Sequence, residues 1–257
     1  APMPMRRILQ SLMVVVVACL AAGAATAREL KVLTAGAFKP VVAALAPVFE
    51  GQTGHTVRIE NDTAGALARR IGNGEAFDVV VLTPAAMEPL EQAGRVARGS
   101  SVRLARVAIG VAVKQGAPRP DIATESDFRQ ALLAARAVAY IDPAAGGSSG
   151  IYLTQLFQRM GIAAQIAPKA VLVPGGLVAQ RLVSGEADLA LHQISEILAV
   201  PGVTLVGPIP AEVQNYTVYA GGLAATSADL PAARAFLELL AGERAKTVLK
   251  DKGMEAP

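Results

Sequence analysis

Residues 140–152 have the sequence Tyr-Ile-Asp-Pro-Ala-Ala-Gly-Gly-Ser-Ser-Gly-Ile-Tyr, and the pattern of the chain changes within this stretch. A β-type run at residues 137–141 leads into it, and apolar residues with helical spacing follow it. The Asp-Pro pair ends a strand, and the glycines allow the backbone to turn tightly before a helix begins. The stretch therefore predicts a strand-to-helix turn.

This predicted turn is also a candidate site for an anion. The amides of a helix's first turn have no partner inside the helix, so those of Ser148, Ser149 and Gly150 would face outward. The two serine hydroxyls would lie beside them. A solvated loop that ends in a serine cap is the alternative use of the same residues.

Strands and helices alternate on both sides of this turn. Continuously apolar strands separated by amphipathic helices favour parallel sheets that are covered on both faces, so the predicted class is α/β. The predicted strands are residues 30–34, 56–60, 77–82, 137–141, 170–173 and 189–192, and helices are predicted at 41–49, 64–73, 127–135, 177–184, 232–240 and 245–249.

Two longer β-type runs, residues 102–113 and 216–224, suggest that the chain crosses twice between two lobes. The first lobe would then combine residues 28–108 with 217–257, and the second would hold residues 109–216. Ligands of such folds bind outside the carboxyl ends of the strands, which places the expected site between the lobes.

A weak internal repeat supports two similar halves. Residues 64–81 and 175–191 each contain a helix opened by glycine, a second glycine, and a Glu-Ala…Asp turn that leads into an apolar strand. Reuse of one common turn in an α/β protein is the alternative explanation.

The first 27 residues have the layout of a secretory signal peptide. Arg6 and Arg7 precede an apolar run, and small residues end at Ala27, where cleavage is expected. Lipid attachment at Cys19 and a single membrane anchor are the alternatives. The exported chain would be a periplasmic protein with a net charge near +1 and without cysteine. It has no cluster of basic and aromatic residues, so no nucleic-acid partner is expected.

Four pieces of the chain, in this order and spacing, resemble the molybdate-type periplasmic solute-binding proteins of ABC importers, which belong to the type II periplasmic binding proteins. They are residues 32–38, 63–67, 142–152 and 185–188. The resemblance implies a monomer with two α/β lobes joined by crossover strands, a small anion such as molybdate or tungstate in the cleft, and an ABC transporter permease in the inner membrane as partner. It implies no cofactor.

Carried over to this chain, the resemblance gives a set of candidate ligand contacts. They are Gly36, Ala37, Lys39, Thr63, Ala64, Gly65, Ser148, Ser149, Gly150, Gly176 and Gln193. Hydroxyl-bearing residues usual in the family are replaced here by Ala37, Ala64 and Gln193, which weakens the case for molybdate because a desolvated dianion needs most of its oxygens hydrogen-bonded. A small carboxylated organic solute paired with Lys39 is the second hypothesis.

Catalytic chemistry has less support in the sequence, and the expected protein is not an enzyme. Residues 146–150 match the Gly-x-Ser-x-Gly motif of serine hydrolases, with Ser148 as nucleophile and Asp188 and His192 as possible partners. No His-Gly-Gly segment precedes it. His55 and His192 have no second ligand at metal-binding spacing, and no nucleotide-binding glycine motif follows a strand.

Overall fold

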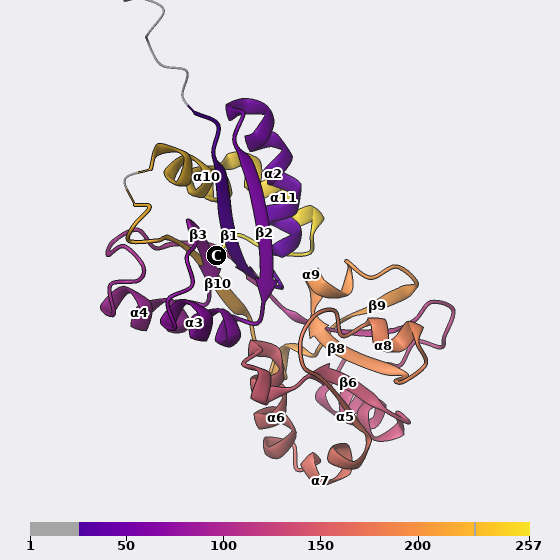
Figure 1. The fold of residues 1–257 in the computed structure, drawn as a ribbon. Coiled ribbons are helices and arrows are strands. Elements are labelled where there is room, and N and C mark those ends of the chain that lie inside the picture. The colour runs from indigo at the N-terminus through magenta and orange to yellow at the C-terminus, as the bar shows by residue number, and fades with distance from the viewer. Residues whose placement is uncertain (1–25, 229) are drawn as a thin grey trace, which may run out of the picture.

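The computed structural model describes residues 26–228 and 230–257, which form two α/β lobes (Figure 1). Each lobe is built around one five-stranded sheet. The predicted fold class is thus confirmed. The predicted signal peptide and Cys19 lie almost wholly outside the described residues. Within the described ranges, no helix is both long and apolar enough to cross a membrane.

The first sheet has the strand order β2-β1-β3-β10-β4. Its strands are β1 (Glu29–Ala35), β2 (Thr56–Asp62), β3 (Val79–Leu82), β4 (Val102–Val107) and β10 (Thr217–Leu223). The second sheet has the order β7-β6-β8-β5-β9. Its strands are β5 (Ile109–Lys114), β6 (Val138–Ile141), β7 (Ala170–Val173), β8 (Leu189–Gln193) and β9 (Val203–Pro208).

In each sheet one strand runs against the other four. This strand is β10 in the first sheet and β5 in the second, and each is antiparallel to both of its neighbours. Both are the first strand formed after the chain arrives from the other lobe. Such a strand starts at the cleft and runs away from it. The other four strands of each sheet run toward the cleft and end at it. The arrangement therefore brings carboxyl ends from both sheets to the space between the lobes.

The chain changes sheet at Ala108, which separates β4 from β5. The single β-type run predicted at residues 102–113 is therefore two strands in two different sheets. The return path follows β9 and ends where β10 begins. The predicted lobe boundaries fall between strands of the two sheets, and as boundaries of separate domains they remain a prediction.

Within residues 26–228 and 230–257, five helices belong to the first lobe. They are α2 (Lys39–Thr53), α3 (Ala64–Gly72), α4 (Pro84–Gln92), α10 (Pro231–Ala241) and α11 (Glu243–Asp251). Helices α2, α10 and α11 pack together on one face of the sheet, and α3 and α4 lie on the other (Figure 1). Phe49 and Phe236 meet edge to face between α2 and α10, with ring centroids 5.1 Å apart.

The helices of the second lobe include three that are only four residues long. The lobe carries α5 (Glu125–Ala134), α6 (Ser148–Arg159), α7 (Ala163–Ile166), α8 (Gln180–Val183) and α9 (Ile194–Ile197). Helix α6 follows β6 directly, as the sequence predicts, and Tyr140 meets Phe157 edge to face across them at 5.5 Å. Helix α8 is shorter than the predicted 177–184, because its first residues form turns after Gly176, whose φ is +81°.

The internal repeat is also a repeat of side-chain contacts. In the first lobe, Asp78 accepts a hydrogen bond from the amide of Lys31 at 2.8 Å, which ties the start of β3 to β1. In the second, Asp188 accepts one from the amide of Ala137 at 3.0 Å, which ties the start of β8 to β6. Arginine-glutamate pairs recur five residues apart in both halves, Arg70 with Glu75 and Arg181 with Glu186. The two halves thus fold their Glu-Ala…Asp turns in the same way.

Candidate ligand-binding site

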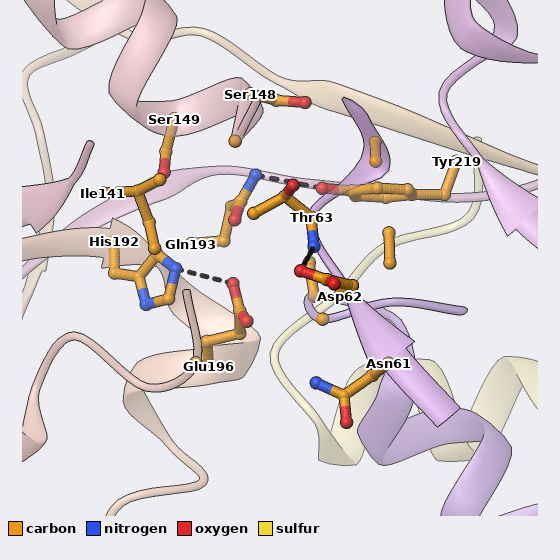
Figure 2. Close-up of a pocket in the computed structure, with 16 residues that line it drawn as sticks. Asn61, Asp62, Thr63, Ile141, Ser148, Ser149, His192, Gln193, Glu196 and Tyr219 are labelled. Atoms are coloured by element: carbon orange, nitrogen blue, oxygen red, sulfur yellow. Dashed lines mark hydrogen bonds and ion pairs between the residues drawn. The ribbon is translucent and has the colours of Figure 1, made fainter. Parts of the chain in front are cut away.

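A cleft lies between the lobes at the carboxyl ends of the strands (Figure 2). It is lined by Ala35, Gly36, Ala37, Asn61, Asp62, Thr63, Ala64, Ile141, Gly147, Ser148, Ser149, Gly176, His192, Gln193, Glu196 and Tyr219. The space inside this lining is about 380 Å³ when its open mouth is included, but the part that a water molecule can enter is only about 30 Å³. A small ligand is therefore the kind that the cleft fits.

Two strand-to-helix turns form the wall contributed by the first lobe. One follows β1 and includes Gly36 and Ala37, and the other follows β2 and includes Asp62 and Thr63. Thr63 caps α3, since its hydroxyl accepts a hydrogen bond from the amide of Ala66 at 3.1 Å. One carboxylate oxygen of Asp62 accepts a hydrogen bond from the amide of Thr63 at 2.8 Å. These turns present main-chain groups and one carboxylate to the cleft.

The opposite wall begins with the turn between β6 and α6. Gly147 occupies the N-cap position of α6 and has no side chain to satisfy the first amides of the helix. The amides of Ser148, Ser149 and Gly150 accordingly have no partner inside the helix. Ser149 is 1% exposed, and its hydroxyl has no hydrogen-bond partner among the described residues. Unpaired donors therefore gather at the start of α6, as the sequence predicts for an anion site.

The end of β8 and the single turn α9 complete this wall with a buried pair of polar side chains, His192 and Glu196. The Nε2 atom of His192 lies 2.7 Å from a carboxylate oxygen of Glu196, and both side chains are less than a tenth exposed. The Nδ1 atom of His192 is buried without a partner in the described structure. A buried carboxylate beside an imidazole is costly to keep unless it is paired, so the pair is a built feature of the cleft wall.

Tyr219 reaches the cleft from β10 and links the two lobes. Its hydroxyl accepts a hydrogen bond from Nε2 of Gln193 at 3.0 Å. Burial, and after it the negative charge of Glu196, raise the pKa of the Tyr219 hydroxyl far above its ordinary value, although Ser148 and Gln193 act in the opposite sense. The hydroxyl keeps its proton at neutral pH and is available as a donor to a ligand.

Direct hydrogen bonds hold the lobes against each other around the cleft. The hydroxyl of Thr63 donates to the carbonyl of Ala145, and the amide of Gly65 donates to the carbonyl of Gly146 at 3.2 Å. The buried hydroxyl of Ser195 donates to the carbonyl of Ala37 at 2.7 Å. Each of these bonds joins one lobe to the other, so the structure shows the closed arrangement of the cleft.

The lining residues carry an unusual balance of charge for an anion site. They include two carboxylates, on Asp62 and Glu196, and no lysine or arginine. An anion here would depend on main-chain amides, hydroxyls and the ring of His192 rather than on a cationic side chain. The acidic groups also restrict which ligand atoms can lie next to them, because an ionised carboxylate accepts hydrogen bonds but cannot donate one.

The structure brings most of the predicted contact residues to one place. Those that line the cleft are Gly36, Ala37, Thr63, Ala64, Ser148, Ser149, Gly176 and Gln193, whereas Lys39, Gly65 and Gly150 do not line it. Lys39 is exposed at the first position of α2, where the helix buries Val41 and Val42 instead. The expected charge partner for an organic anion is thus absent from the lining.

The two glycines outside the lining have packing roles. A Cβ atom on Gly65 would lie 2.8 Å from the Cα atom of Gly146, so the two backbones touch across the cleft. A Cβ atom on Gly150 would lie 2.0 Å from the carbonyl oxygen of Ile141, so α6 packs directly on the end of β6. Both positions shape the site without contacting its interior.

Sequence reasoning missed several groups that the structure places in the lining. They are Asn61, Asp62, Glu196 and Tyr219, and the sequence offers His192 only as a possible hydrolase partner of Ser148. Asp62 directly precedes the helix cap Thr63, which is a local signal of a strand end. Tyr219 has no such signal, because it comes from β10. Its hydroxyl nevertheless lies beside the side-chain amide of Gln193, which comes from a different strand.

The hydrolase arrangement is not assembled in this structure. Asp188 lies at the start of β8, where it accepts hydrogen bonds from the amides of Arg136 and Ala137, while His192 lies near the end of the strand and pairs with Glu196. Neither is arranged to activate Ser148. Among residues 26–228 and 230–257, no group of three or more His, Cys, Asp or Glu side chains is placed to hold a metal ion.

Comparison with known proteins places these features in a family. Residues 30–255 match the model of the bacterial extracellular solute-binding proteins. An aconitate isomerase from a Pseudomonas species is 38% identical over 232 residues, which cover 88% of this chain and 87% of that protein. The molybdate-binding protein ModA of Azotobacter vinelandii is 28% identical over 256 residues, which cover 95% and 97% of the two chains.

Solved structures agree on the fold. The periplasmic molybdate-binding protein of Azotobacter vinelandii superposes with a TM-score of 0.75 at 25% identity, over 89% of this chain and all of that one. The sulfate-binding protein SubI of Mycobacterium tuberculosis gives a TM-score of 0.72 at 18% identity, over 89% and 87% of the two chains. With two lobes, a closed cleft and a family match over nearly the whole described chain, this protein belongs to the bacterial extracellular solute-binding proteins.

Proposed function

We propose that the chain binds a small unsaturated polycarboxylate of the aconitate kind in its cleft and interconverts the isomers of that compound. The observation that carries the proposal is the buried pair of His192 and Glu196 in the cleft wall. Acid-base chemistry needs such groups, and simple retention of an anion does not. The Pseudomonas relative named aconitate isomerase, which spans most of both chains, supports the same reading.

The cleft wall also argues against a fully ionised inorganic oxyanion. Such an ion offers only hydrogen-bond acceptors, and Glu196 presents a carboxylate that is 6% exposed. Two acceptors facing each other in a desolvated site repel. Ala37 and Ala64 carry methyl groups, whereas hydroxyl groups at these positions could have donated hydrogen bonds that compensate for this repulsion. An organic acid differs because it can turn a C–H group toward Glu196 and keep its own carboxylates elsewhere.

The remaining walls suit the carboxylates of such an acid. The first-turn amides of α6 and the hydroxyl of Ser149 are unpaired donors, and the hydroxyl of Tyr219 retains its proton. Hydrogen bonds from neutral donors to a carboxylate strengthen when water is excluded. A small carboxylated organic solute is also the second hypothesis from the sequence. In that hypothesis Lys39 pairs with the carboxylate, whereas here neutral hydrogen-bond donors take that role.

This proposal changes one expectation from the sequence, namely that the chain only binds its solute. The family is one of solute-binding proteins, and the cleft retains that architecture. An isomerase on this scaffold keeps the binding step and adds a proton transfer inside the closed cleft. Export to the periplasm, cleavage after Ala27 and a monomeric state are parts of the same proposal and agree with the family assignment.

A receptor for an oxyanion is the second candidate function. It would deliver molybdate or a similar ion to an ABC transporter permease in the inner membrane. The start of α6, with Ser148 and Ser149, favours it, because unpaired amides and hydroxyls at a helix N-terminus bind any small anion. The molybdate-binding relative from Azotobacter vinelandii supports it as well.

A binding and turnover test separates the two candidates. We expect cis- or trans-aconitate to raise the melting temperature, since a ligand at 100 times its Kd adds about 2.7 kcal/mol to the free energy of unfolding. We expect proton NMR to show one isomer converting into the other. Molybdate and sulfate are the comparison ligands. Stabilisation by molybdate alone, with no aconitate bound, would establish the oxyanion receptor instead.

Ser149→Ala should affect stability and binding in opposite directions. The substitution removes a buried hydroxyl without a partner, so the ligand-free protein should gain up to about 1 kcal/mol in its free energy of unfolding. Aconitate affinity should fall about tenfold, since a donor to the ligand is lost. Lys39→Ala is the control and should change affinity by less than about 0.5 kcal/mol. Calorimetric titration and thermal melting measure both quantities; a tenfold effect of Lys39→Ala would contradict this assignment.

A further inference from the structure

We propose that Glu196 is the catalytic base of the isomerisation, that His192 positions it, and that closing the lobes brings it to the substrate. The inference rests on the proposed function and adds the residues that move the proton. It is argued from the contacts of the two carboxylate oxygens of Glu196, because these oxygens lie in different surroundings.

The first oxygen of Glu196 is occupied by His192. Its Oε2 atom lies 2.7 Å from Nε2 of the ring, and the two residues are four apart, His192 in β8 and Glu196 in α9. The other ring nitrogen, Nδ1, is buried without a hydrogen-bond partner in the described structure. A doubly protonated ring would leave a buried N–H group there without an acceptor, which costs free energy. A proton on Nε2 is directed to Glu196 and holds this carboxylate oxygen in place.

The second oxygen of Glu196 faces the other lobe. A Cβ atom built on Gly36 would lie 2.4 Å from Oε1, so the carboxylate reaches into space that the missing side chain of Gly36 leaves open. No described residue donates a hydrogen bond to this oxygen. It therefore remains an accepting site on the cleft wall, beside the turn that follows β1 (Figure 2). This is the geometry that a base needs, with one oxygen held and the other free.

The other carboxylate in the lining is less suited to this role. One oxygen of Asp62 accepts the amide of Thr63 at 2.8 Å, and the other lies 3.9 Å from a guanidinium nitrogen of Arg70. Its side chain is 38% exposed, so water solvates it as well. Both oxygens of Asp62 therefore already have a neighbouring amide, guanidinium group or solvent, unlike the second oxygen of Glu196. Asp62 thus provides a natural comparison within the same cleft.

The chemistry balances without any co-reactant. Oε1 of Glu196 removes a proton from the CH₂ carbon of aconitate, so a C–H bond breaks and an O–H bond forms. The electron pair moves through the adjacent double bond and its conjugated carboxylate. The protonated Oε1, whose proton can exchange with solvent, then delivers a proton to the carbon at the far end of the former double bond, and the double bond is now displaced by one position. No atom is gained or lost, and nothing is oxidised or reduced.

Neutral donors are placed to stabilise the charge that spreads into the substrate carboxylate during this step. The Tyr219 hydroxyl and the amides of Ser148 and Ser149 lie in the same lining as Glu196. Donors that are fixed before the reaction stabilise developing charge most effectively in a closed site. Glu196 belongs to the second lobe and Gly36 to the first, so opening the cleft separates the base from that wall.

Glu196→Gln tests the assignment because it keeps the shape of the side chain and removes the base. We expect kcat for aconitate isomerisation to fall by about 10³-fold, within the range for general acid-base catalysis, while aconitate affinity stays within about threefold. Deuterium incorporation into aconitate in D₂O should be lost with it. Glu88→Gln, at an exposed position on α4, is the matched control and should retain the wild-type kcat, whereas Asp62→Asn tests the other carboxylate of the cleft lining.

Two further variants guard against a misfolded protein. Glu196→Asp keeps the carboxylate but withdraws it by one methylene group, so slow turnover and slow deuterium exchange should remain. His192→Asn should lower kcat about tenfold with little change in KM, as expected for a positioning residue. Circular dichroism and melting curves verify the fold of each variant.

The possible outcomes are distinct. If the wild type isomerises aconitate and Glu196→Gln does so at a similar rate, Glu196 is not the base and the proposed function stands. If Asp62→Asn abolishes turnover and Glu196→Gln does not, the base is Asp62. If the wild type binds aconitate but neither isomerises it nor exchanges deuterium into it, the catalytic inference and the isomerase function both fail, and only binding remains.

Discussion

Gly150→Ala should destabilise the protein by about 3 kcal/mol, at the upper end of the range for overpacking. The added methyl group would lie 2.0 Å from the carbonyl oxygen of Ile141 and 2.8 Å from its carbonyl carbon. These are backbone atoms of β6, which cannot rotate out of the way as a side chain can. Helix α6 would have to move away from β6, and the start of α6 carries the donors of the cleft.

The effect is measurable by thermal unfolding without ligand. A loss of about 3 kcal/mol corresponds to a fall in Tm of roughly 6–12 °C for a chain of this size. Gly51→Ala is the matched control, since Gly51 lies in α2 with nothing within 4 Å of an added Cβ atom. It should stabilise the protein by about 0.5–1 kcal/mol. Equal melting temperatures for the two variants would mean that α6 does not pack on β6 as described.

Gly65→Ala should weaken ligand binding about tenfold or more and leave the ligand-free protein as stable as the wild type. Its Cβ atom would lie 2.8 Å from the Cα atom and 3.1 Å from the carbonyl oxygen of Gly146, in the opposite lobe. This clash exists only while the lobes are closed, so opening relieves it. Alanine is also a better helix former than glycine, which offsets any local cost in α3.

Gly72→Ala provides the control, because Gly72 ends the same helix with open space around it. Calorimetric titration with aconitate should show the loss of affinity for the first variant alone, where 1.4 kcal/mol corresponds to each factor of ten. Small-angle scattering with saturating aconitate should show that Gly65→Ala stays more extended than the wild type. Unchanged affinity would show that binding does not require this contact between the lobes.

The features that were predicted correctly from the sequence are the ones coded locally. The turn from β6 into α6 is determined by residues that are close in sequence. Asp142 and Pro143 end the strand, and Gly147 precedes the helix. The helix predicted at residues 64–73 is observed as α3 for the same reason. Since the ends of parallel strands meet at one edge of a sheet, such turns locate the cleft once the α/β alternation is recognised.

The residues that escaped prediction depend on contacts between distant parts of the chain. Tyr219 enters the cleft only because β10 pairs with β3 and β4 and begins at the crossing between lobes. Glu196 looks in sequence like an ordinary helix residue, and its burial follows from the turn around Gly36 on the other lobe. The direction of Lys39 was equally undetermined, because the first turn of a helix offers both a solvent side and a buried side.

The position of β10 between β3 and β4 has a consequence for the order in which the two lobes fold. In the first sheet, Val81 pairs with Gly221 across 140 positions of sequence, and β4 has no other partner than β10 among the strands. The second sheet, in contrast, is made from one continuous segment, and shorter loops close at lower entropic cost. Pulse-labelling hydrogen exchange should therefore detect protection in β6 and β8 before β4; the reverse order would refute this. During refolding the lobe that begins the chain is expected to be the last one finished.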